Sequence, residues 1–439
     1  MPGHVTAASR LPEIRTAVPG PRSVEGAERL ARTECPSLTT RRARRAERTG
    51  SPFDPITWAA ATGVHVEDVD GNLYVDMIGA FSVAAAGHSH PEVVAAVQAQ
   101  AARLCHALGD VHPSAPKLAL LERLAAYSPY DDARIILGLN GADALAAALK
   151  TAVLRTGRPG VLAFEGGYHG LMYGPLALCG FAPPFREPFA DQLNPHARFA
   201  PYPRSQDGLD ACLHAVDQAL TDDIGAVVVE PALGRGGCVF PPDAFLPALA
   251  ELCRARGALL VLDEIFTGFG RTGARWAHGD IEPDLICVGK ALGGGLPISA
   301  CIGPEAVMSA WGDPAGAPIH AATFAGNPLA CAAALASLTV LERDGLAARA
   351  AEVGETWLGE LRRALLPAAP VVDVRGRGLM IGVELDDGDH TLRVVQRLLE
   401  RGWLTLPAGP RAEVLQLTPP LIIEPALLQA FTATLLDVL

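Results

Sequence analysis

Residues 259–273 read LLVLDEIFTGFGRTG, and this stretch contains two patterns that indicate different chemistry. Its four leading apolar residues predict a buried strand that ends at Asp263. Its later glycines fit G-x-G-x-x-G, the pattern of a dinucleotide-binding loop. That loop requires a helix to begin within the glycines, whereas the next residues, ARWAHGDIEPD, contain His, Gly and Pro and show no helical period. We therefore interpret the glycines as a loop and the carboxylate as the group with a chemical role.

A lysine follows the next apolar run, in DLICVGKALGGGLP, residues 284–297. Lys290 is one of only three lysines in the chain, and the other two, Lys117 and Lys150, lie in predicted helices. An amine at the poorly hydrated carboxyl edge of a sheet has a lowered pKa and becomes nucleophilic. Such lysines form Schiff bases with carbonyl compounds, including pyridoxal phosphate. The glycines after Lys290 allow a flat ligand to approach the backbone closely.

Two further strand ends carry residues that suit a cofactor. In LGLNGADALAAALK, Asn140-Gly141-Ala142 joins a predicted strand to a predicted helix, and loop amides at a helix N-terminus bind phosphate. In FEGGYHG, Tyr168 and His169 follow another predicted strand, where an aromatic ring can stack on a cofactor ring. These positions and Lys290 together favour a phosphate-bearing carbonyl cofactor over a lone structural carboxylate at Asp263.

The order of the predicted elements indicates the fold class. Short, continuous apolar runs alternate with helical segments, which is typical of a parallel α/β sheet covered on both faces. We expect a weakly patterned, flexible N-terminal arm over residues 1–50, with one short helix at most. We expect a large cofactor-binding domain over 91–328 and a separate, smaller α+β domain over 329–439.

Composition excludes several classes of function. The net charge of −12 argues against general nucleic-acid binding, and we interpret RRARRAER, residues 41–48, as a solvated face or arm instead of a nucleic-acid or membrane patch. The chain has nine cysteines, an odd number without a C-x-x-C motif, as expected for reduced thiols in the cytoplasm. No stretch resembles a signal peptide or a membrane span, so we expect no membrane association.

The ordered motifs NGADA, GYHG, VVVEP, DEIFTGFGRTG, GKALGGGLP and TFAGNPLA resemble the class III, or ornithine-aminotransferase-like, family of pyridoxal-phosphate enzymes. The resemblance runs from about Trp58 to the C-terminus. It implies fold type I, with a mostly parallel seven-stranded sheet in a large domain and a smaller domain built from both chain ends, its N-terminal part over 51–90 and its C-terminal part over 329–439. It also implies a homodimer whose active sites are shared across the interface.

The resemblance implies roles for individual residues. Lys290 matches the Schiff-base lysine, and Asp263 matches the aspartate that pairs with the pyridine nitrogen of the cofactor. Other positions match further cofactor-binding residues: Gly141 and Ala142 at the phosphate, Tyr168 and Ile265 on the two faces of the ring, Glu230 at the Glu-Pro position, and Thr323 at the phosphate across the dimer interface.

Departures from the family pattern concern the substrate side. Phe266 stands where Gln often contacts the cofactor. Many members have a Glu shortly after the Glu-Pro pair and an Arg before a Pro-Pro pair that binds the substrate carboxylate, but this chain has Arg235 and Gln416 there. We hypothesise that Arg235 has taken over carboxylate recognition and that Phe81 and Phe266 narrow the pocket. The alternative is that Arg235 pairs with a surface carboxylate.

The sequence therefore predicts an aminotransferase, or transaminase, that moves an amino group between an amine or amino acid donor and a keto acid by a ping-pong mechanism through a Lys290 Schiff base. An amino-acid racemase or epimerase on the same scaffold is an alternative. A non-catalytic cofactor-binding protein is a second alternative, which the intact Lys290 and Asp263 argue against. We expect no metal site at His88 and His90, because that pair matches the family's GH-x-HP turn.

Overall fold

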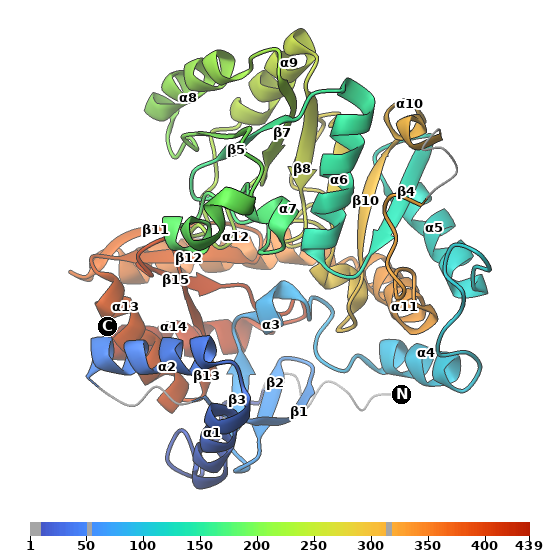
Figure 1. Cartoon of the computed structure of the whole chain (residues 1–439). Helices are drawn as coiled ribbons and strands as arrows, with labels where there is room; N and C mark the ends of the chain where they lie inside the picture. The colour runs from blue at the N-terminus through green and yellow to red at the C-terminus, as the bar shows by residue number, and fades with distance from the viewer. Residues whose placement is uncertain (1–9, 51–54, 313–317) are drawn as a thin grey trace.

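A sheet of seven strands forms the centre of the computed structural model, which describes residues 10–50, 55–312 and 318–439 (Figure 1). Across the sheet the strands are β4 (Ala133–Gly138), β10 (Ser299–Pro304), β9 (Leu285–Val288), β8 (Leu259–Asp263), β7 (Ile224–Val229), β5 (Gly160–Phe164) and β6 (Ala197–Ala200). Strand β10 is antiparallel to both of its neighbours, and all other pairs are parallel. The predicted mostly parallel seven-stranded sheet is confirmed.

The central strands are buried on both faces, which explains their continuous apolar sequences. Every residue of β5, β7, β8 and β9 is buried. Alternate residues enter two separate cores: Val161 and Val261 pack with helix α6 (Gly141–Thr156), whereas Leu162 and Leu260 belong to the core that contains α8 (Gln206–Ala219) and α9 (Phe245–Arg256). Helices therefore cover both faces, as a parallel sheet requires.

Other helices flank this sheet or connect its strands. Helices α4 (Pro91–Ala101) and α5 (Ala115–Tyr127) both pack against α11 (Pro328–Arg343). The short helices are α3 (Gly79–Ser82), α7 (Tyr173–Leu176) and α10 (Glu305–Met308). Within the described ranges, no helix combines the length and the apolar character that crossing a membrane requires.

Two smaller sheets lie beside the large one (Figure 1). One consists of β11 (Val371–Arg377), β12 (Met380–Leu385), β15 (Val414–Leu417) and β14 (Leu406–Ala408), accompanied by α12 (Leu346–Leu365), α13 (Gly388–Glu400) and α14 (Pro425–Val438). The other consists of β1 (Trp58–Thr62), β2 (His65–Asp68), β3 (Leu73–Asp76) and β13 (Trp403–Leu404). Because β13 pairs with β3, residues from both ends of the chain form one sheet.

The N-terminal segment has more regular structure than its sequence pattern predicts. It forms two helices, α1 (Pro21–Thr33) and α2 (Pro36–Thr49), where we expected at most one short helix. Both begin with proline, which suits the first helical position because its missing N–H has no partner there in any case. Helix α2 packs against α13, and Figure 1 shows the two helices next to each other.

Candidate active site

A cavity of about 1120 Å³ opens where the carboxyl ends of five strands meet. Asn140 follows β4, Tyr168 follows β5, Glu230 follows β7, Asp263 ends β8 and Lys290 follows β9. Parallel strands bring these ends to one edge of the sheet, which is where open α/β sheets bind ligands. Eleven of the twelve predicted site residues line this cavity: Phe81, Gly141, Ala142, Tyr168, Glu230, Arg235, Asp263, Ile265, Phe266, Lys290 and Gln416.

Asp263 is buried, and hydrogen bonds fix both of its carboxylate oxygens. Oδ2 contacts Nδ1 of His169 at 2.8 Å, and Oδ1 accepts a bond of 3.1 Å from the backbone N–H of Ile265. Burial opposes a charge on His169, but the hydrogen bond to Asp263 and the negative charges of Asp263 and Glu230 together outweigh it, so the pKa of His169 is raised above its ordinary value. The sequence did not indicate this partnership, although GYHG placed His169 at the correct strand end.

Lys290 has an unusual backbone and a poorly hydrated amine. Its φ of 45° lies in the left-handed region, which costs a residue with a side chain about 1–3 kcal/mol. Its Nζ lies 4.5 Å from the centre of the Phe266 ring. Burial lowers the pKa of Lys290, and the negative charge of Asp263 opposes this shift only in part. A larger fraction of the amine is therefore neutral, and hence nucleophilic, at a given pH.

The N-terminus of α6 forms a close-fitting wall of the cavity. Asn140 caps the helix by accepting a hydrogen bond from the N–H of Asp143 at 3.1 Å. A Cβ atom on Gly141 would lie 2.6 Å from Cδ1 of Ile265, so only glycine fits there without displacing that side chain. The first N–H groups of a helix have no acceptor within the helix, which makes this end suitable for an anion such as phosphate.

Glu230 is buried and connects two loops of the site. Oε1 accepts a hydrogen bond from the N–H of Tyr168, and Oε2 accepts one from the N–H of Gly234, both at 2.8 Å. Burial raises the pKa of Glu230 to about 7, because the desolvated carboxylate is disfavoured. The carboxyl group therefore fixes the backbone on either side of the cavity while keeping less negative charge than an exposed glutamate.

Arg235 lies among aromatic rings instead of beside a carboxylate. Its guanidinium carbon is 4.7 Å from the centre of the Tyr168 ring, 5.1 Å from that of Phe181 and 5.5 Å from that of Phe185. No carboxylate among the described residues forms an ion pair with it. Gln416 is buried and donates a hydrogen bond of 3.4 Å to the carbonyl of Gly234, next to Arg235. Gln416 thus contacts the loop that carries the arginine.

Thr323 is the one predicted site residue that does not line the cavity, and its side chain is exposed. Phe81 lines the cavity but keeps 63% of its surface exposed. The histidine pair has local structural contacts: His88 bonds to Asp76 at 2.8 Å, and His90 caps α4 by accepting from the N–H of Glu92. Thr323 therefore does not contribute to the cavity of its own chain, and both histidines have partners.

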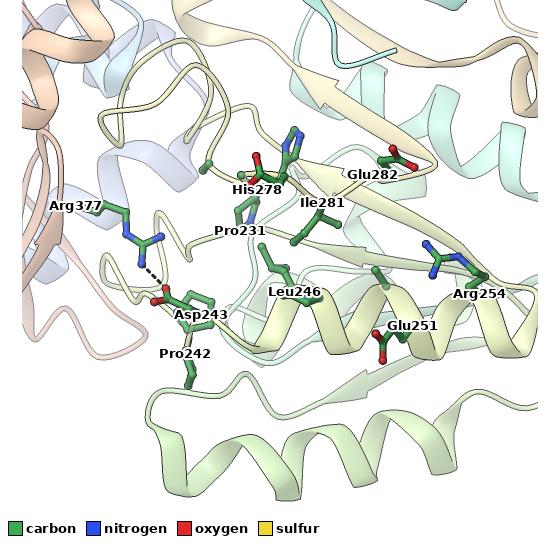
Figure 2. A pocket seen from close by; sticks show the side chains of 16 residues that line it. Pro231, Pro242, Asp243, Leu246, Glu251, Arg254, His278, Ile281, Glu282 and Arg377 are labelled. Atoms are coloured by element: carbon green, nitrogen blue, oxygen red, sulfur yellow. Dashed lines mark hydrogen bonds and ion pairs between the residues drawn. The ribbon is translucent and has the colours of Figure 1, made fainter. Parts of the chain in front are cut away.

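A second cavity, of about 550 Å³, lies away from these residues (Figure 2). Figure 2 shows Asp243 and Arg377 joined at one side, where their ion pair measures 3.0 Å. His278 lines this cavity and contacts Oε1 of the buried Glu264 at 2.9 Å. Neither Lys290 nor Asp263 lines it. The larger cavity is therefore the candidate active site.

Comparison with known proteins agrees with this geometry. The family model "Aminotransferase class-III" matches residues 47–439. Acetylornithine aminotransferase of Methanopyrus kandleri is 38% identical over 390 residues, covering 88% of this chain and 94% of that protein. The 4-aminobutyrate aminotransferase of Mycobacterium leprae is 34% identical, covering 97% of each chain. These relatives favour the aminotransferase prediction and give no support to the racemase alternative.

Solved structures show the same relationship. Ornithine aminotransferase of Toxoplasma gondii superimposes with a TM-score of 0.77 at 32% identity, covering 88% of this chain and 90% of that one. An amine transaminase from an uncultivated Pseudomonas species, solved with pyridoxal phosphate bound, gives a TM-score of 0.82 at 27% identity, covering 88% and 94%. The fold is therefore fold type I, as the resemblance implied.

The residues around the cavity fit pyridoxal phosphate chemically. A desolvated amine is available for an aldehyde, a buried carboxylate for a ring nitrogen, a helix N-terminus for a phosphate, and a tyrosine and an isoleucine for the faces of a flat ring. Nε2 of His169 is buried without a partner among the described residues, which leaves a polar atom for a bound group. The chain belongs to the class III family of pyridoxal-phosphate-dependent aminotransferases.

Proposed function

We propose that Lys290 and Asp263 are the catalytic residues of this aminotransferase. The carrying observation is that the ends of β8 and β9 bring a lowered-pKa amine and a buried carboxylate into one cavity. Bound pyridoxal phosphate supplies an electron-withdrawing ring that stabilises negative charge on the substrate carbon. Nζ of Lys290 holds the cofactor and then moves the proton at the reacting carbon. Asp263, fixed by His169, keeps a proton on the ring nitrogen.

The remaining cofactor contacts divide between phosphate and ring. Gly141 and Ala142 offer backbone N–H groups to the phosphate at the start of α6. Tyr168 and Ile265 confine the ring from its two faces. Glu230 positions Tyr168 through the hydrogen bond to its backbone N–H. In each case the protein contributes orientation, because the bond-making chemistry belongs to the cofactor.

We infer that the protein acts as a homodimer with shared active sites. Thr323 is exposed, and the neighbouring Phe324 keeps 57% of its surface exposed while contacting His106. Leu108 and Val111, in the segment that follows His106, are 65% and 68% exposed. A patch of apolar side chains next to an unused cofactor-binding threonine fits an interface that delivers Thr323 to the other subunit.

Replacing Thr323 by alanine should weaken binding of pyridoxal phosphate by about 10-fold or more without dissociating the dimer, because one hydrogen bond to a charged phosphate is lost. Cofactor affinity is measured by fluorescence titration and mass by sedimentation velocity. Thr339→Ala is the matched control, since Thr339 is exposed and donates to the carbonyl of Leu335 within α11. If Thr323→Ala is a confirmed dimer and its affinity for the cofactor is unchanged, Thr323 does not bind the phosphate of the other subunit's cofactor.

For the substrates, we propose an amine or amino acid donor and a keto-acid acceptor, with Arg235 binding a substrate carboxylate. The guanidinium carbon of Arg235 lies 4.7 to 5.5 Å from the ring centres of Tyr168, Phe181 and Phe185, and the guanidinium N–H donors suit the two oxygens of a carboxylate. Gln416 at the other family position offers only a neutral amide. Phe81 and Phe266, which also line the cavity, narrow the space for apolar parts of the substrate.

Replacing Arg235 by alanine should lower kcat/KM by about 100-fold for a donor with a carboxylate, because a charged hydrogen-bonded contact is lost. The half-reaction of a plain amine donor should change little. Both donors are assayed in single-turnover half-reactions, so that the keto acid does not contribute. Equal losses for the two donors, or no loss for either, would contradict carboxylate binding by Arg235.

We propose the cytoplasm as the location of the enzyme. All nine cysteines are free thiols in the structure, and only Cys35 and Cys105 are exposed. Free thiols persist where glutathione and thioredoxin keep the compartment reducing. As a homodimeric aminotransferase, the enzyme has small-molecule substrates and a second copy of the chain as its partners.

A further inference from the structure

Helix α2 forms one wall of the active-site cavity. Leu38, Arg41, Arg42 and Arg45 of this helix line the cavity, although they lie far in sequence from the strand ends that hold Lys290. Arg41 and Arg45 are four residues apart, so they extend from one face of the helix. Contacts between α2 and α13 hold the helix in this place. The arginine-rich segment is therefore part of the site, not only a solvated arm.

The cavity contains more positive than negative side chains. Five cationic residues line it (Arg41, Arg42, Arg45, Arg235 and Lys290), against three carboxylates (Glu34, Glu230 and Asp263). Each carboxylate already has partners: Glu34 pairs with Arg42 at 2.9 Å, Glu230 accepts two backbone N–H groups, and Asp263 bonds to His169. Among the residues that the structure describes, no carboxylate forms an ion pair with Arg41 or Arg235.

The arginines also affect one another. The side chain of Arg41 is exposed to solvent, yet partial desolvation at the cavity wall lowers its pKa, and the positive charge of Arg235 lowers it further. Burial and the charges of Arg41 and Arg235 lower the pKa of Arg45 to about 10. These guanidiniums remain charged at neutral pH, and like charges four residues apart destabilise a helix. A negatively charged group bound between α2 and Arg235 offsets this repulsion.

We propose that Arg41 of α2 is a specificity residue that binds a carboxylate at the far end of the amino donor, beyond the carboxylate bound by Arg235. The donor is then an acidic amino acid with two carboxylates. This inference rests on the proposed function, in which Arg235 binds the first of them. Arg41, Tyr168 and Arg235 line the same cavity, and the guanidinium carbon of Arg235 lies 4.7 Å from the centre of the Tyr168 ring, so both arginines are placed where one ligand can contact them.

Matched donors test the proposal in single-turnover half-reactions. L-2-aminoadipate and L-norleucine share a six-carbon chain and differ in the distal carboxylate. The native enzyme should favour aminoadipate, and Arg41→Gln should lower kcat/KM for aminoadipate by about 10- to 100-fold while leaving norleucine unchanged. Arg41→Lys, which keeps the charge, should recover part of the loss. An equal effect of Arg41→Gln on both donors would overturn the proposal.

Arg44→Gln is the matched control. Arg44 lies on the same helix, is exposed and does not line the cavity, yet its replacement removes the same charge. This variant should behave like the native enzyme with both donors. If Arg44→Gln loses aminoadipate preference as strongly as Arg41→Gln does, the effect reflects the overall charge of α2, and Arg41 has no specific contact.

A binding measurement separates this inference from the proposed function. Calorimetry with glutarate and with butyrate needs no turnover, so it can use the Lys290→Ala protein. Glutarate should bind more tightly than butyrate, and Arg41→Gln should abolish the difference. If the protein binds glutarate no more tightly than butyrate, Arg41 does not bind a distal carboxylate. The same conclusion follows if Arg41→Gln still binds glutarate more tightly than butyrate but no longer forms a dimer. If the native enzyme shows no turnover but glutarate binding still depends on Arg41, the proposed function is contradicted and this inference is not.

Discussion

Replacing Lys290 by alanine should abolish amino transfer, with kcat falling by at least about 10⁴-fold. Lys290 combines two roles that no neighbour can take over, because its amine both holds the cofactor and moves the proton. Of the three lysines, all of which the structure describes, Lys290 alone lines the cavity. The amine of Lys117 donates to the carbonyl of Gly109 at 3.1 Å, and that of Lys150 to the carbonyl of Ile319 at 2.6 Å.

Chemical labelling identifies the lysine directly. Treatment of the cofactor-loaded protein with borohydride, followed by peptide mass mapping, should place the pyridoxyl group on Lys290. Lys150→Ala is the control, since it removes an exposed lysine and should retain both label and turnover. Thermal unfolding of each variant shows whether the fold is intact. A pyridoxyl group on Lys117 or Lys150 in the native protein would refute the assignment.

The large sheet could be predicted from sequence because strands that are buried on both faces have continuous apolar sequences. Each residue of β8 is buried, so the segment Leu259–Asp263 is apolar on both faces until its final carboxylate. The same holds for β9, after which Lys290 follows by two residues. A charged residue directly after such a run lies at the sheet edge by necessity. The positions of Asp263 and Lys290 therefore follow from local pattern alone.

Helix α2 could not be placed in the same way. Its sequence, PSLTTRRARRAERT, has no apolar face that predicts packing. Polar contacts hold it instead, such as the ion pair of Arg48 with Asp389, 341 residues away. A helix held in place by distant charges does not need an apolar face, so its sequence does not show where it packs. The prolines at the start of α1 and α2 are local sequence features that indicate where a helix begins.

The sequence also did not predict several side-chain contacts in the site, because these contacts join segments that are far apart in the chain. His169 and Asp263 are 94 residues apart, and no spacing rule joins them. Phe181 and Phe185, whose rings lie close to the guanidinium of Arg235, are in a segment without a recognisable motif. The sequence predicted eleven of the residues that line the cavity, but it did not predict those from α2 or the contacts between residues of the site. Pairings of this kind depend on the tertiary fold, where local propensity carries little information.

Replacing Asp263 by alanine should leave the fold intact and lower kcat by about 1000-fold or more, because a charge pair at the reacting system is worth several kcal/mol of barrier. Without the carboxylate, nothing holds a proton on the ring nitrogen, and a neutral pyridine withdraws electrons weakly. His169 also loses its partner at Nδ1, and an unsatisfied buried donor costs about 1–3 kcal/mol of stability. The measurements are single-turnover rates and thermal unfolding.

Asp263→Asn and a modified cofactor separate charge from shape. Asparagine keeps the side-chain volume and can still contact His169, so it should restore stability but not rate. Pyridoxal phosphate methylated at the ring nitrogen carries a permanent positive charge there and needs no carboxylate to maintain it. Asp263→Ala loaded with this cofactor should therefore regain a large part of its lost rate. If the methylated cofactor gives no gain, or if Asp263→Asn with ordinary cofactor is fully active, the charge of Asp263 does not act on the ring nitrogen.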